Sequence, residues 1–494
     1  MPKYIFNNYY CLHHDLKRTF ILTNDSERIE PKVPVNNRWK SVIHPIYAMM
    51  LSFFSTPISI QDAINKIANF FEISENEVGS FINAIIHNTE PSHTDFEGHE
   101  NGFPINIIID AEKETHGRHL YKPTDFIFNE FDPLTRRMFV APLTIVFMPN
   151  NNCFTQCLYC YADTKTRKGA LSEEEIINFI ENASKNKVRE ILLTGGDFFM
   201  HSNWKKILSI LISHGYTPDM ISTKKPLSIE DILFLEPLGV RLQISLDSIN
   251  EDICHNLLCV NKGYVDKMKD SLIRINNSAI PFQVSTVLTK LNDPIEELEK
   301  LKSFLSNLSN LRHWEIRVAF KSLYSSSNFD DIKSTRKQIE KIGNWVSKNK
   351  ESFHTLLLWS PDEDAKYQNT KGGSINFEGP ICSANMTNMV VLPNGDVTIC
   401  EQLYWNKDFL IGNIKEHSIE EIWNSKRALT IWNRSQNSIK KDSPCHTCKA
   451  FSECFKYANR CYANIIKAYG FDNYDYPDPR CNLAPIFNIN ITHE

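Results

Sequence analysis

The first ninety residues hold two apolar runs followed by three amphipathic segments. The runs YIFNNYYCLHH and RTFILTN are rich in aromatic and aliphatic residues, and they are expected to pair as a hairpin around Asp15-Leu16-Lys17. Apolar residues then recur at helical spacing over 44–54, 59–71 and 74–87. The pattern predicts a winged-helix-like α+β module over residues 1–90.

Polar signals mark where the last helix of this module begins and where the module ends. Ser74 is followed three positions later by Glu77, a pair that forms a capping box at a helix N-terminus. Residues 88–103 are polar and rich in turn-forming residues. We therefore expect a linker after the module, over residues 91–140.

Between residues 141 and 350, short apolar runs alternate with amphipathic segments. A capping box formed by Ser172 and Glu175 begins one of the expected helices. Repeated strand–helix units predict a parallel sheet, either doubly wound or curved into a barrel. The candidate strands are 143–149, 190–195, 219–223, 242–246, 282–288 and 314–320, and further helices are expected over about 203–214, 263–277, 294–308 and 331–348.

The last part of the chain differs from the strand–helix region. Residues 371–380 are irregular and rich in glycine, which is typical of a connection between domains. We therefore expect a linker over residues 351–377 and a separate cysteine-rich domain over residues 378–494.

Composition and charge exclude several classes of protein. A chain of 494 residues with 42% hydrophobic residues is typical of a folded protein of several domains. The formal net charge of -5 is small and basic residues are spread along the chain, so we expect no nucleic-acid partner and no membrane partner. The N-terminus lacks a secretory signal, and no apolar run approaches the about 20 residues of a membrane span. A cytoplasmic protein is expected.

The 13 cysteines are unevenly placed. Three lie within 153–160 and seven within 382–481, whereas Cys11, Cys254 and Cys259 stand apart. An odd number of cysteines in a chain without a secretory signal argues against a disulfide framework. The two clusters therefore indicate metal binding, and the three isolated cysteines are expected to be ordinary thiols.

The first cluster is Cys153-Phe-Thr-Gln-Cys157-Leu-Tyr-Cys160, directly after an apolar strand. Active sites of parallel α/β folds lie beyond the carboxyl ends of the strands. A [4Fe–4S] cluster usually takes four thiolates, so three thiolates leave one iron with an open position, as a catalytic metal requires. A structural zinc site and buried thiols are the alternatives, although structural zinc sites favour two cysteine pairs.

This CxxxCxxC loop resembles the signature of the radical S-adenosylmethionine (SAM) superfamily. The resemblance implies a partial (β/α)6 TIM-like barrel in which Cys153, Cys157 and Cys160 hold a [4Fe–4S] cluster. In that superfamily SAM binds the open iron and is cleaved to a 5′-deoxyadenosyl radical, which abstracts a hydrogen atom. Tyr159, the aromatic residue before the third cysteine, fits the same pattern.

Several residues at the ends of later strands resemble the SAM contacts of the superfamily. Thr194-Gly195-Gly196-Asp197 stands where GGE is usual, and the shorter Asp is expected to act less directly on the SAM amino group. Ser245-Leu-Asp247 resembles a ribose-contacting segment. Turns, helix caps and a surface salt bridge are the alternative explanations. The resemblance implies SAM contacts at Tyr159, Gly195, Gly196, Asp197, Ser222, Ser245, Asp247 and Arg317.

The second cluster resembles the SPASM domain, the auxiliary iron–sulfur extension of radical SAM enzymes that modify peptides. The segment Cys445-x2-Cys448-x5-Cys454-x6-Cys461 departs from the family spacing only in its last interval, where three residues are usual. The resemblance implies two auxiliary [4Fe–4S] clusters. The first would be held in part by Cys382, Cys400 and Cys461, and the second by Cys445, Cys448, Cys454 and Cys481.

The first auxiliary cluster lacks an obvious fourth ligand, because residues 366–381 contain no cysteine. Its fourth iron is therefore expected to be open or to bind an oxygen ligand such as Glu378. Zinc is the alternative metal for this part of the chain, since a Cys-x2-Cys pair also suits a zinc knuckle. Glu401, directly after Cys400, stands where sulfatase-maturing relatives have an Asp, which makes it a candidate catalytic base. A loop carboxylate without a catalytic role is the alternative.

The N-terminal module resembles the PqqD-like recognition element of ribosomal peptide maturases. Such elements bind the leader of a precursor peptide as an added strand. The hairpin within residues 3–24 and the helix that begins near Ser74 are the expected edge. A structural cap on the barrel is the alternative.

Together these features predict a radical SAM oxidoreductase that modifies a ribosomally made precursor peptide, with a thioether or carbon–carbon crosslink as the expected product. An external electron donor of the flavodoxin or ferredoxin type is implied. The alternatives are an anaerobic sulfatase-maturing (formylglycine-forming) enzyme, a peptide epimerase, a peptide decarboxylase and a non-catalytic peptide-binding or electron-transfer partner.

Overall fold

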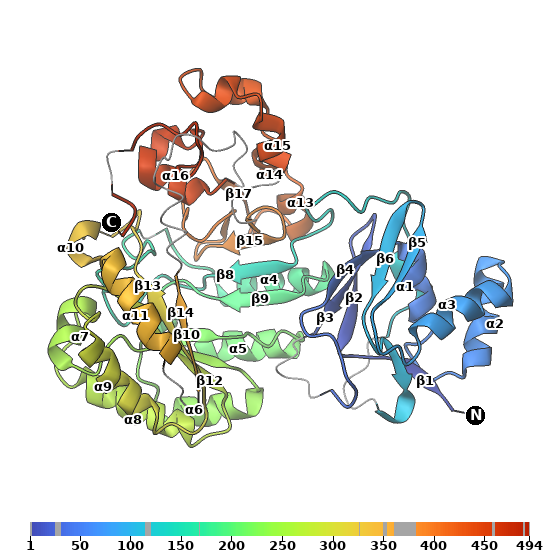
Figure 1. Cartoon of the computed structure of the whole chain (residues 1–494), viewed down its shortest axis with the longest axis horizontal. Helices are drawn as coiled ribbons and strands as arrows, with labels where there is room; N and C mark the ends of the chain where they lie inside the picture. Colours follow the sequence, from blue (N-terminus) through green and yellow to red (C-terminus); the bar gives the residue numbers. More distant parts are fainter. Residues whose placement is uncertain are drawn as a thin grey trace. The chain divides into compact units, whose positions relative to one another are not determined.

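A computed structural model describes residues 2–24, 31–113, 120–166, 168–325, 327–348, 353–359, 382–456, 460–487 and 490–493. The chain divides into two compact units, Met1–Ala141 and Pro142–Glu494 (Figure 1). In the described part of the chain, no helix has the length and apolar character needed to cross a membrane.

The first unit combines small antiparallel sheets with three helices. β2 (Tyr10–His14), β3 (Thr19–Thr23) and β4 (Lys40–Ile43) form one sheet, and the predicted hairpin between β2 and β3 is confirmed. The helices α1 (Pro45–Ser52), α2 (Ile60–Phe71) and α3 (Glu75–Ile85) occupy the predicted segments. The capping box of Ser74 and Glu77 is present at the start of α3.

The expected linker over residues 91–140 is wrong for its first part. β5 (Ser92–Phe96) and β6 (His99–Phe103) form a hairpin, and β7 (Ile108–Asp110) pairs with β1 (Tyr4–Phe6). These strands belong to the first unit because Phe103, Ile107 and Ile108 join its apolar core. Two short 3-10 helices, Ala111–Lys113 and Pro123–Phe126, follow.

The outer edge of the expected peptide-binding hairpin is occupied within the first unit. The Leu12 N–H of β2 donates to the Tyr121 hydroxyl at 3.0 Å. On the other side of the sheet, the Val42 carbonyl of β4 is hydrogen-bonded by the His99 ring at 3.0 Å. A strand added to either edge would compete with these hydrogen bonds, and the edge expected from the sequence stays a prediction.

In the described part of the second unit, parallel strands alternate with helices as predicted, and one further strand follows the six predicted ones. The strands are β8 (Thr144–Phe147), β9 (Glu190–Leu193), β10 (Ile221–Thr223), β11 (Leu242–Ser245), β12 (Phe282–Leu288), β13 (Leu311–Val318) and, beyond the predicted ones, β14 (His354–Leu358). β10 to β14 form one sheet in sequence order, and β8 and β9 belong to a second sheet. β14 lies inside the segment expected to be a linker over residues 351–377, so that expectation is wrong for residues 354–358.

The second sheet continues into the cysteine-rich region. β15 (Asn388–Val391) pairs in parallel with β8, and β16 (Asp396–Thr398) and β17 (Leu410–Asn413) follow in antiparallel order. Met148 and Ala162 near the first cysteine loop pack with Val390 and Leu392 in one apolar cluster. The cysteine-rich region is therefore continuous with the strand–helix region through this sheet.

Helices cover the parallel strands (Figure 1). The capping box of Ser172 and Glu175 begins α4 as predicted, and the apolar faces of the helices supply core residues such as Ile180, Leu208 and Leu272. The helices are α4 (Glu173–Lys185), α5 (Trp204–Ser213), α6 (Ile229–Leu235), α7 (Glu251–Leu258), α8 (Tyr264–Asn276), α9 (Ile295–Leu305), α10 (Phe329–Ile332) and α11 (Arg336–Lys348), with 3-10 turns at Phe198–Met200 and Glu236–Leu238.

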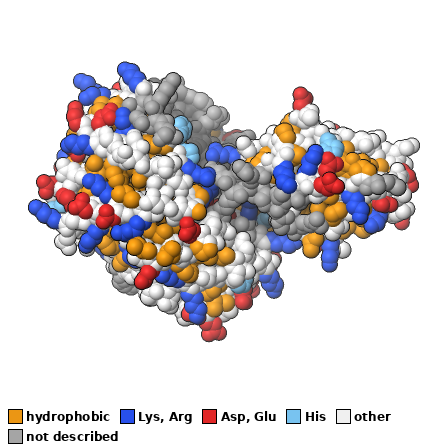
Figure 2. Space-filling view, turned by 90° about the horizontal axis from the view of Figure 1, so that it is seen from below, with side chains coloured by type: hydrophobic (Ala, Val, Ile, Leu, Met, Phe, Trp, Pro, Cys, Tyr) orange, Lys and Arg blue, Asp and Glu red, His pale blue; other side chains and the backbone are white. Residues whose placement is uncertain are grey.

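The cysteine-rich end consists of short helices and turns. They are α13 (Ile419–Trp423), α14 (Lys426–Trp432), α15 (Phe451–Lys456) and α16 (Tyr462–Tyr469), with 3-10 turns at Gln436–Ser438, Pro444–Thr447 and Phe471–Asn473. Among the described residues no disulfide joins any of the 13 cysteines. Figure 2 shows acidic and basic side chains interspersed over the visible face of the molecule.

Candidate active site

The Cys153–Cys160 loop follows β8 and is fixed by backbone hydrogen bonds to a distant helix. The N–H groups of Gln156 and Leu158 donate to the carbonyls of Leu258 and Leu257, at the end of α7. The Ser325 hydroxyl donates to the Leu158 carbonyl at 2.7 Å. These bonds hold the loop at the carboxyl ends of the parallel strands, where α/β enzymes place their active sites.

The two glycines after β9 let that strand approach the cysteine loop. A Cβ atom on Gly196 would lie 1.9 Å from the Asn152 carbonyl oxygen, and one on Gly195 would lie 2.4 Å from the Asn150 carbonyl oxygen. Gly195 also has a φ of +121°, which disfavours other residues. The N–H groups of Gly196 and Asp197 donate to these same carbonyls, so the glycines join the strand end to the loop.

A cavity of about 650 Å³ opens beside the three cysteines of this loop. Ligand sites for small molecules usually have volumes of about 300–1,000 Å³, so the cavity has room for a cofactor. Cys153, Cys157, Tyr159 and Cys160 line it together with Gly195, Gly196, Asp197, Ser222, Ser245 and Arg317. Cys382, Cys400 and Glu401 from the cysteine-rich region line the same cavity.

Asp247 is buried and binds its neighbours through both carboxylate oxygens. Oδ2 accepts from the Tyr159 hydroxyl and from Lys224 Nζ at 2.9 Å, and Oδ1 accepts from the Val287 N–H at 2.8 Å. Its side chain has no exposed surface. A carboxylate with these partners holds Tyr159 and Lys224 in place, which differs from the ribose contact expected from the sequence.

Lys224 is a cation at the cavity wall to which the sequence prediction gave no role. Its side chain is 12% exposed. Burial lowers the pKa of Lys224, but the negative charges of Asp247 and Cys157 outweigh this effect and the net shift is upward. Its position directly after the third parallel strand was the one available signal, because side chains there face the active site of this fold class.

The Asp197 carboxylate forms hydrogen bonds that hold the cavity wall together. Oδ2 accepts from the Thr223 hydroxyl at 2.7 Å and from the N–H groups of Lys224 and Lys225, and Oδ1 accepts from the Phe199 N–H. Burial raises the pKa of this carboxyl, and the hydrogen bonds oppose that rise. The side chain therefore joins the ends of β9 and β10, consistent with the less direct role expected for it.

Three further predicted residues present polar atoms to the cavity. The Ser222 and Ser245 hydroxyl groups lie 3.3 Å apart, and Gln243 donates to Ser222 at 3.1 Å. Arg317 donates twice to Glu315, at 2.7 and 3.1 Å, and its side chain is 49% exposed. Arg317 is therefore a partly exposed cation at the cavity wall, and its charge lowers the pKa of Glu401.

Glu401 faces Tyr161 across the cavity region. The Tyr161 hydroxyl donates to Glu401 Oε2 at 3.4 Å. Burial raises the pKa of Glu401, while the Tyr161 hydrogen bond and the Arg317 charge oppose the rise. A carboxylate with a raised pKa beside a cysteine-lined cavity is suited to accept a proton.

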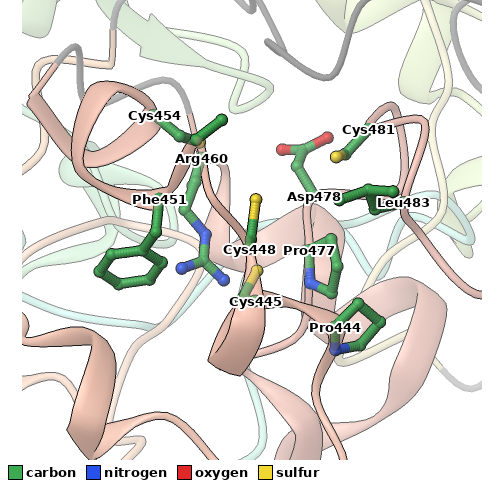
Figure 3. Close-up of a pocket in the computed structure, with 11 residues that line it drawn as sticks. Pro444, Cys445, Cys448, Phe451, Cys454, Arg460, Pro477, Asp478, Cys481 and Leu483 are labelled. Carbon is green, nitrogen blue, oxygen red and sulfur yellow. The ribbon is translucent and has the colours of Figure 1, made fainter.

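Four of the predicted metal ligands share a separate, mostly apolar pocket. Cys445 lies in the 3-10 turn Pro444–Thr447 and Cys448 directly follows it, and the carbonyls of both cysteines accept hydrogen bonds from Gln436, at 3.1 and 2.8 Å. Cys454 of α15 and Cys481 complete the set, and Figure 3 shows these side chains around the pocket with Arg460 and Asp478. The structure thus gathers the four cysteines expected to hold the second auxiliary cluster.

The remaining three cysteines lie near one another. Cys382 and Cys400 line the large cavity. Burial raises the pKa of Cys400, and the nearby Cys461 and Cys382 raise it further. The Cys461 N–H donates to Asp478 at 2.9 Å, which positions the start of α16. Glu378, the suggested fourth ligand, lies outside the described residues.

The donor set of the first loop fits the implied cluster and SAM in chemistry and room. Thiols are the preferred ligands of iron–sulfur clusters, and three of them face a cavity that also presents hydroxyl groups and the Lys224 cation. Burial raises the pKa of the Cys157 thiol to about 12, and the Lys224 charge opposes that rise. A cation in this position stabilises the thiolate form that binds metal.

Comparisons with known proteins agree with this geometry. Residues 147–305 match the family model of the radical SAM superfamily, and residues 382–449 match SPASM, an iron–sulfur cluster-binding domain. The crystal structure of Streptococcus suis SuiB bound to precursor peptide SuiA covers 98% of this chain and 100% of that chain, with a TM-score of 0.64 at 14% sequence identity. The two proteins therefore share a fold.

Two curated proteins of Bacillus subtilis (strain 168) are similar to the chain in sequence. The sporulation killing factor maturation protein SkfB is 22% identical over 306 residues, which cover 60% of this chain and 68% of SkfB. The antilisterial bacteriocin subtilosin biosynthesis protein AlbA is 22% identical over 301 residues, which cover 60% of this chain and 62% of AlbA. Residues 147–305 of the chain are thus similar to the radical SAM superfamily, and residues 382–449 are similar to the SPASM iron–sulfur domain.

Proposed function

We propose that this enzyme modifies a ribosomally made precursor peptide and joins two of its residues by a thioether or carbon–carbon crosslink. The observation that carries the proposal is the single cavity lined by Cys153, Cys157 and Cys160 on one side and by Cys400 and Glu401 on the other. A peptide side chain in that cavity would lie between the source of the radical and the groups that complete its oxidation.

In this proposal the three cysteines of the first loop hold the catalytic cluster. SAM would meet the backbone of Gly195 and Gly196 and the hydroxyl groups of Ser222 and Ser245. When bound, SAM and the reduced cluster supply the 5′-deoxyadenosyl radical that abstracts a hydrogen atom from the peptide. Lys224 and Arg317 are the cations available for the SAM carboxylate, whereas Asp197 and Asp247 position the residues around them.

Glu401 is the proposed catalytic base. Forming a crosslink removes two hydrogen atoms in all, so a proton must leave the substrate after the first abstraction. The Glu401 carboxylate faces the cavity and its pKa is raised by burial, which suits it to take that proton. Tyr161 fixes its orientation through the 3.4 Å hydrogen bond.

The seven cysteines of the SPASM domain are the proposed ligands of two auxiliary [4Fe–4S] clusters. Their arrangement in one four-cysteine pocket and one three-cysteine group supports this division. The electron removed from the substrate would leave through these clusters. A flavodoxin or ferredoxin type of donor in the reducing cytoplasm would supply the electron that cleaves SAM.

The first unit is the proposed PqqD-like recognition element for the leader peptide. Its order of a three-stranded sheet followed by α1, α2 and α3 supports this assignment. Because the edges of β2 and β4 have partners, we propose that the leader strand adds to β5, whose side chains alternate between exposed and half-buried. The Ser92 hydroxyl donates to the Ala84 carbonyl of α3 at 2.6 Å, so β5 begins beside that helix.

The names of the similar proteins support a peptide substrate. SkfB is named for the maturation of a sporulation killing factor and AlbA for the biosynthesis of the bacteriocin subtilosin. SuiB has been solved with the precursor peptide SuiA bound. A shared fold with a peptide-binding enzyme agrees with the cavity and the first unit described above.

Mass spectrometry of a precursor peptide tests this function. The reduced, anaerobically reconstituted enzyme is incubated with SAM and the peptide encoded in the neighbouring small open reading frame. We expect the peptide to lose a pair of hydrogen atoms, and Cys153→Ala to abolish this change while the exposed Cys259→Ala leaves it intact.

Glu401→Gln sharpens the same experiment. We expect it to keep SAM cleavage but to lower crosslinking by about 10²–10⁴-fold, the usual contribution of a general base. A peptide of unchanged mass and altered stereochemistry would instead identify an epimerase. A Cys153→Ala enzyme that still forms the crosslink would overturn the proposal.

A further inference from the structure

Lys467 of α16 is a buried cation that the proposed function has not used. It is 6% exposed. Its Nζ donates to Gln402 Oε1 at 2.8 Å and lies 4.4 Å from the centroid of the Phe320 ring. Gln402 and Phe320 are both neutral, and they replace only part of the hydration that an ammonium group loses on burial.

The negative charge that would balance Lys467 lies in the three-cysteine group. Cys461 directly precedes α16, and Cys400 lies two residues before Gln402. Burial lowers the pKa of Lys467 to about 8, although the charges of Cys461 and Cys400 oppose this fall and favour the charged form. The charge of Lys321 contributes to the lowering of this pKa. Once these cysteines bind iron they are thiolates, so the site becomes anionic where the lysine is buried.

We propose that Lys467 is the counter-ion of the auxiliary cluster held by Cys382, Cys400 and Cys461, and that it raises the reduction potential of that cluster. The inference rests on the proposed function, because it requires the cluster to be assembled. A nearby cation stabilises the reduced form more than the oxidised form, since the reduced form carries one more negative charge. Lys467 would act on the cluster through its positive charge and would not contact the substrate.

With Lys467 in this place, the auxiliary cluster would accept an electron and the neighbouring Glu401 would accept a proton. After hydrogen abstraction and bond formation, one electron passes from the substrate radical to the auxiliary cluster and one proton passes to Glu401. The product is then a closed-shell peptide. An external one-electron carrier reoxidises the cluster before the next turnover. The Phe320 ring, which contacts Lys467, lines the cavity in which this transfer would begin.

A redox titration followed by electron paramagnetic resonance tests the proposal on the full, reconstituted enzyme. Lys467→Met removes the charge with little change of volume, and Lys467→Arg keeps it. Lys300→Met is the matched control, because Lys300 is an exposed lysine of α9 paired with Glu297. We expect Lys467→Met to make the midpoint potential of one auxiliary cluster more negative, with Lys467→Arg and Lys300→Met close to the wild type.

Iron content separates the possible outcomes. Equal potentials in the wild type and in a fully loaded Lys467→Met enzyme would overturn the proposal, as would equal shifts in the Met and Arg variants. Loss of four irons in Lys467→Met alone would support a counter-ion role, whereas the same loss in both variants would indicate packing and overturn it. A wild-type enzyme without auxiliary signals would contradict the cluster assignment itself, and therefore the proposed function.

Discussion

Two buried aspartates organise the side chains around the cysteine-lined cavity. Asp247 holds Tyr159 and Lys224 next to the first cysteine loop, and Asp197 joins the strand ends at Thr223. Both carboxylates bind groups of the protein itself. These hydrogen bonds orient the side chains that line the cavity. Buried carboxylates of this kind are costly to disturb because the remaining charge loses its partner.

Replacing Asp247 by Asn tests this role. We expect Asp247→Asn to destabilise the protein by about 3–5 kcal/mol, since it leaves the largely buried Lys224 without its counter-charge. Asp270→Asn is the matched control because Asp270 is 65% exposed and lies 4.0 Å from Arg274, and its effect should stay within about 1 kcal/mol. Denaturant unfolding of both variants provides the comparison. Equal stability of the two variants would contradict the anchoring role.

Replacing Gly196 by Ala tests the contact between β9 and the cysteine loop. The added Cβ would lie 1.9 Å from the Asn152 carbonyl oxygen, so the loop must move. We expect Gly196→Ala to lose the cluster of the first loop, with iron falling from about twelve to about eight atoms per chain. Gly79→Ala in α3 is the control, since its Cβ would lie 3.6 Å from Ile64. Full iron content in Gly196→Ala would show that the loop tolerates the displacement.

The candidate site could be predicted from the sequence only in part. The cysteines of the first loop are close in sequence, so their spacing alone brings them together in the cavity. The partners of Asp247 lie at positions 159, 224 and 287, and only the folded sheet places them together. For this reason the sequence motif assigned Asp247 to the ligand, and Lys224 and Tyr161 were missed.

At the scale of elements, β15 joins the SPASM domain to the radical SAM domain. β15 pairs in parallel with β8, the strand that leads into the first cysteine loop. Met389 and Val391 of β15 are fully buried. The two domains therefore share the sheet formed by β8, β9 and β15 to β17, although the sequence suggested separate domains.

Removing the SPASM domain tests this continuity. A chain that ends before Cys382 would expose the edge of β8 and the apolar side chains that pack on β15. We expect such a chain to aggregate, because an unpaired apolar strand edge pairs with other chains. Size-exclusion chromatography distinguishes aggregates from monomers. A soluble monomer that still assembles the first cluster would contradict a shared sheet.

Secondary structure was predictable where local signals dominate. The helices with capping boxes at Ser74 and Ser172 begin where the sequence indicates, because capping depends on residues three positions apart. β5 and β6 were missed because SHTDF and HENGF are polar strands whose apolar contacts come from the rest of the first unit. The pairing of β15 with β8 joins residues more than two hundred positions apart and leaves no local signal.

Across the whole molecule we expect three iron–sulfur clusters in one chain. Iron analysis of the anaerobically reconstituted enzyme should give about twelve atoms per chain, from three four-iron clusters. Cys445→Ala should lower the count to about eight, because Cys445 shares its pocket with three further cysteines. Cys259→Ala should leave the count unchanged. A wild-type count of about four would assign the cysteine-rich end to zinc or to no metal.

Formation of 5′-deoxyadenosine reports on the chemistry proposed for the loop of Cys153, Cys157 and Cys160, which is the cleavage of SAM for hydrogen abstraction. We expect the reduced, reconstituted enzyme to release 5′-deoxyadenosine from SAM, and Cys153→Ala to release none. No 5′-deoxyadenosine from a wild-type enzyme with full iron content, or equal release by Cys153→Ala, would contradict the account.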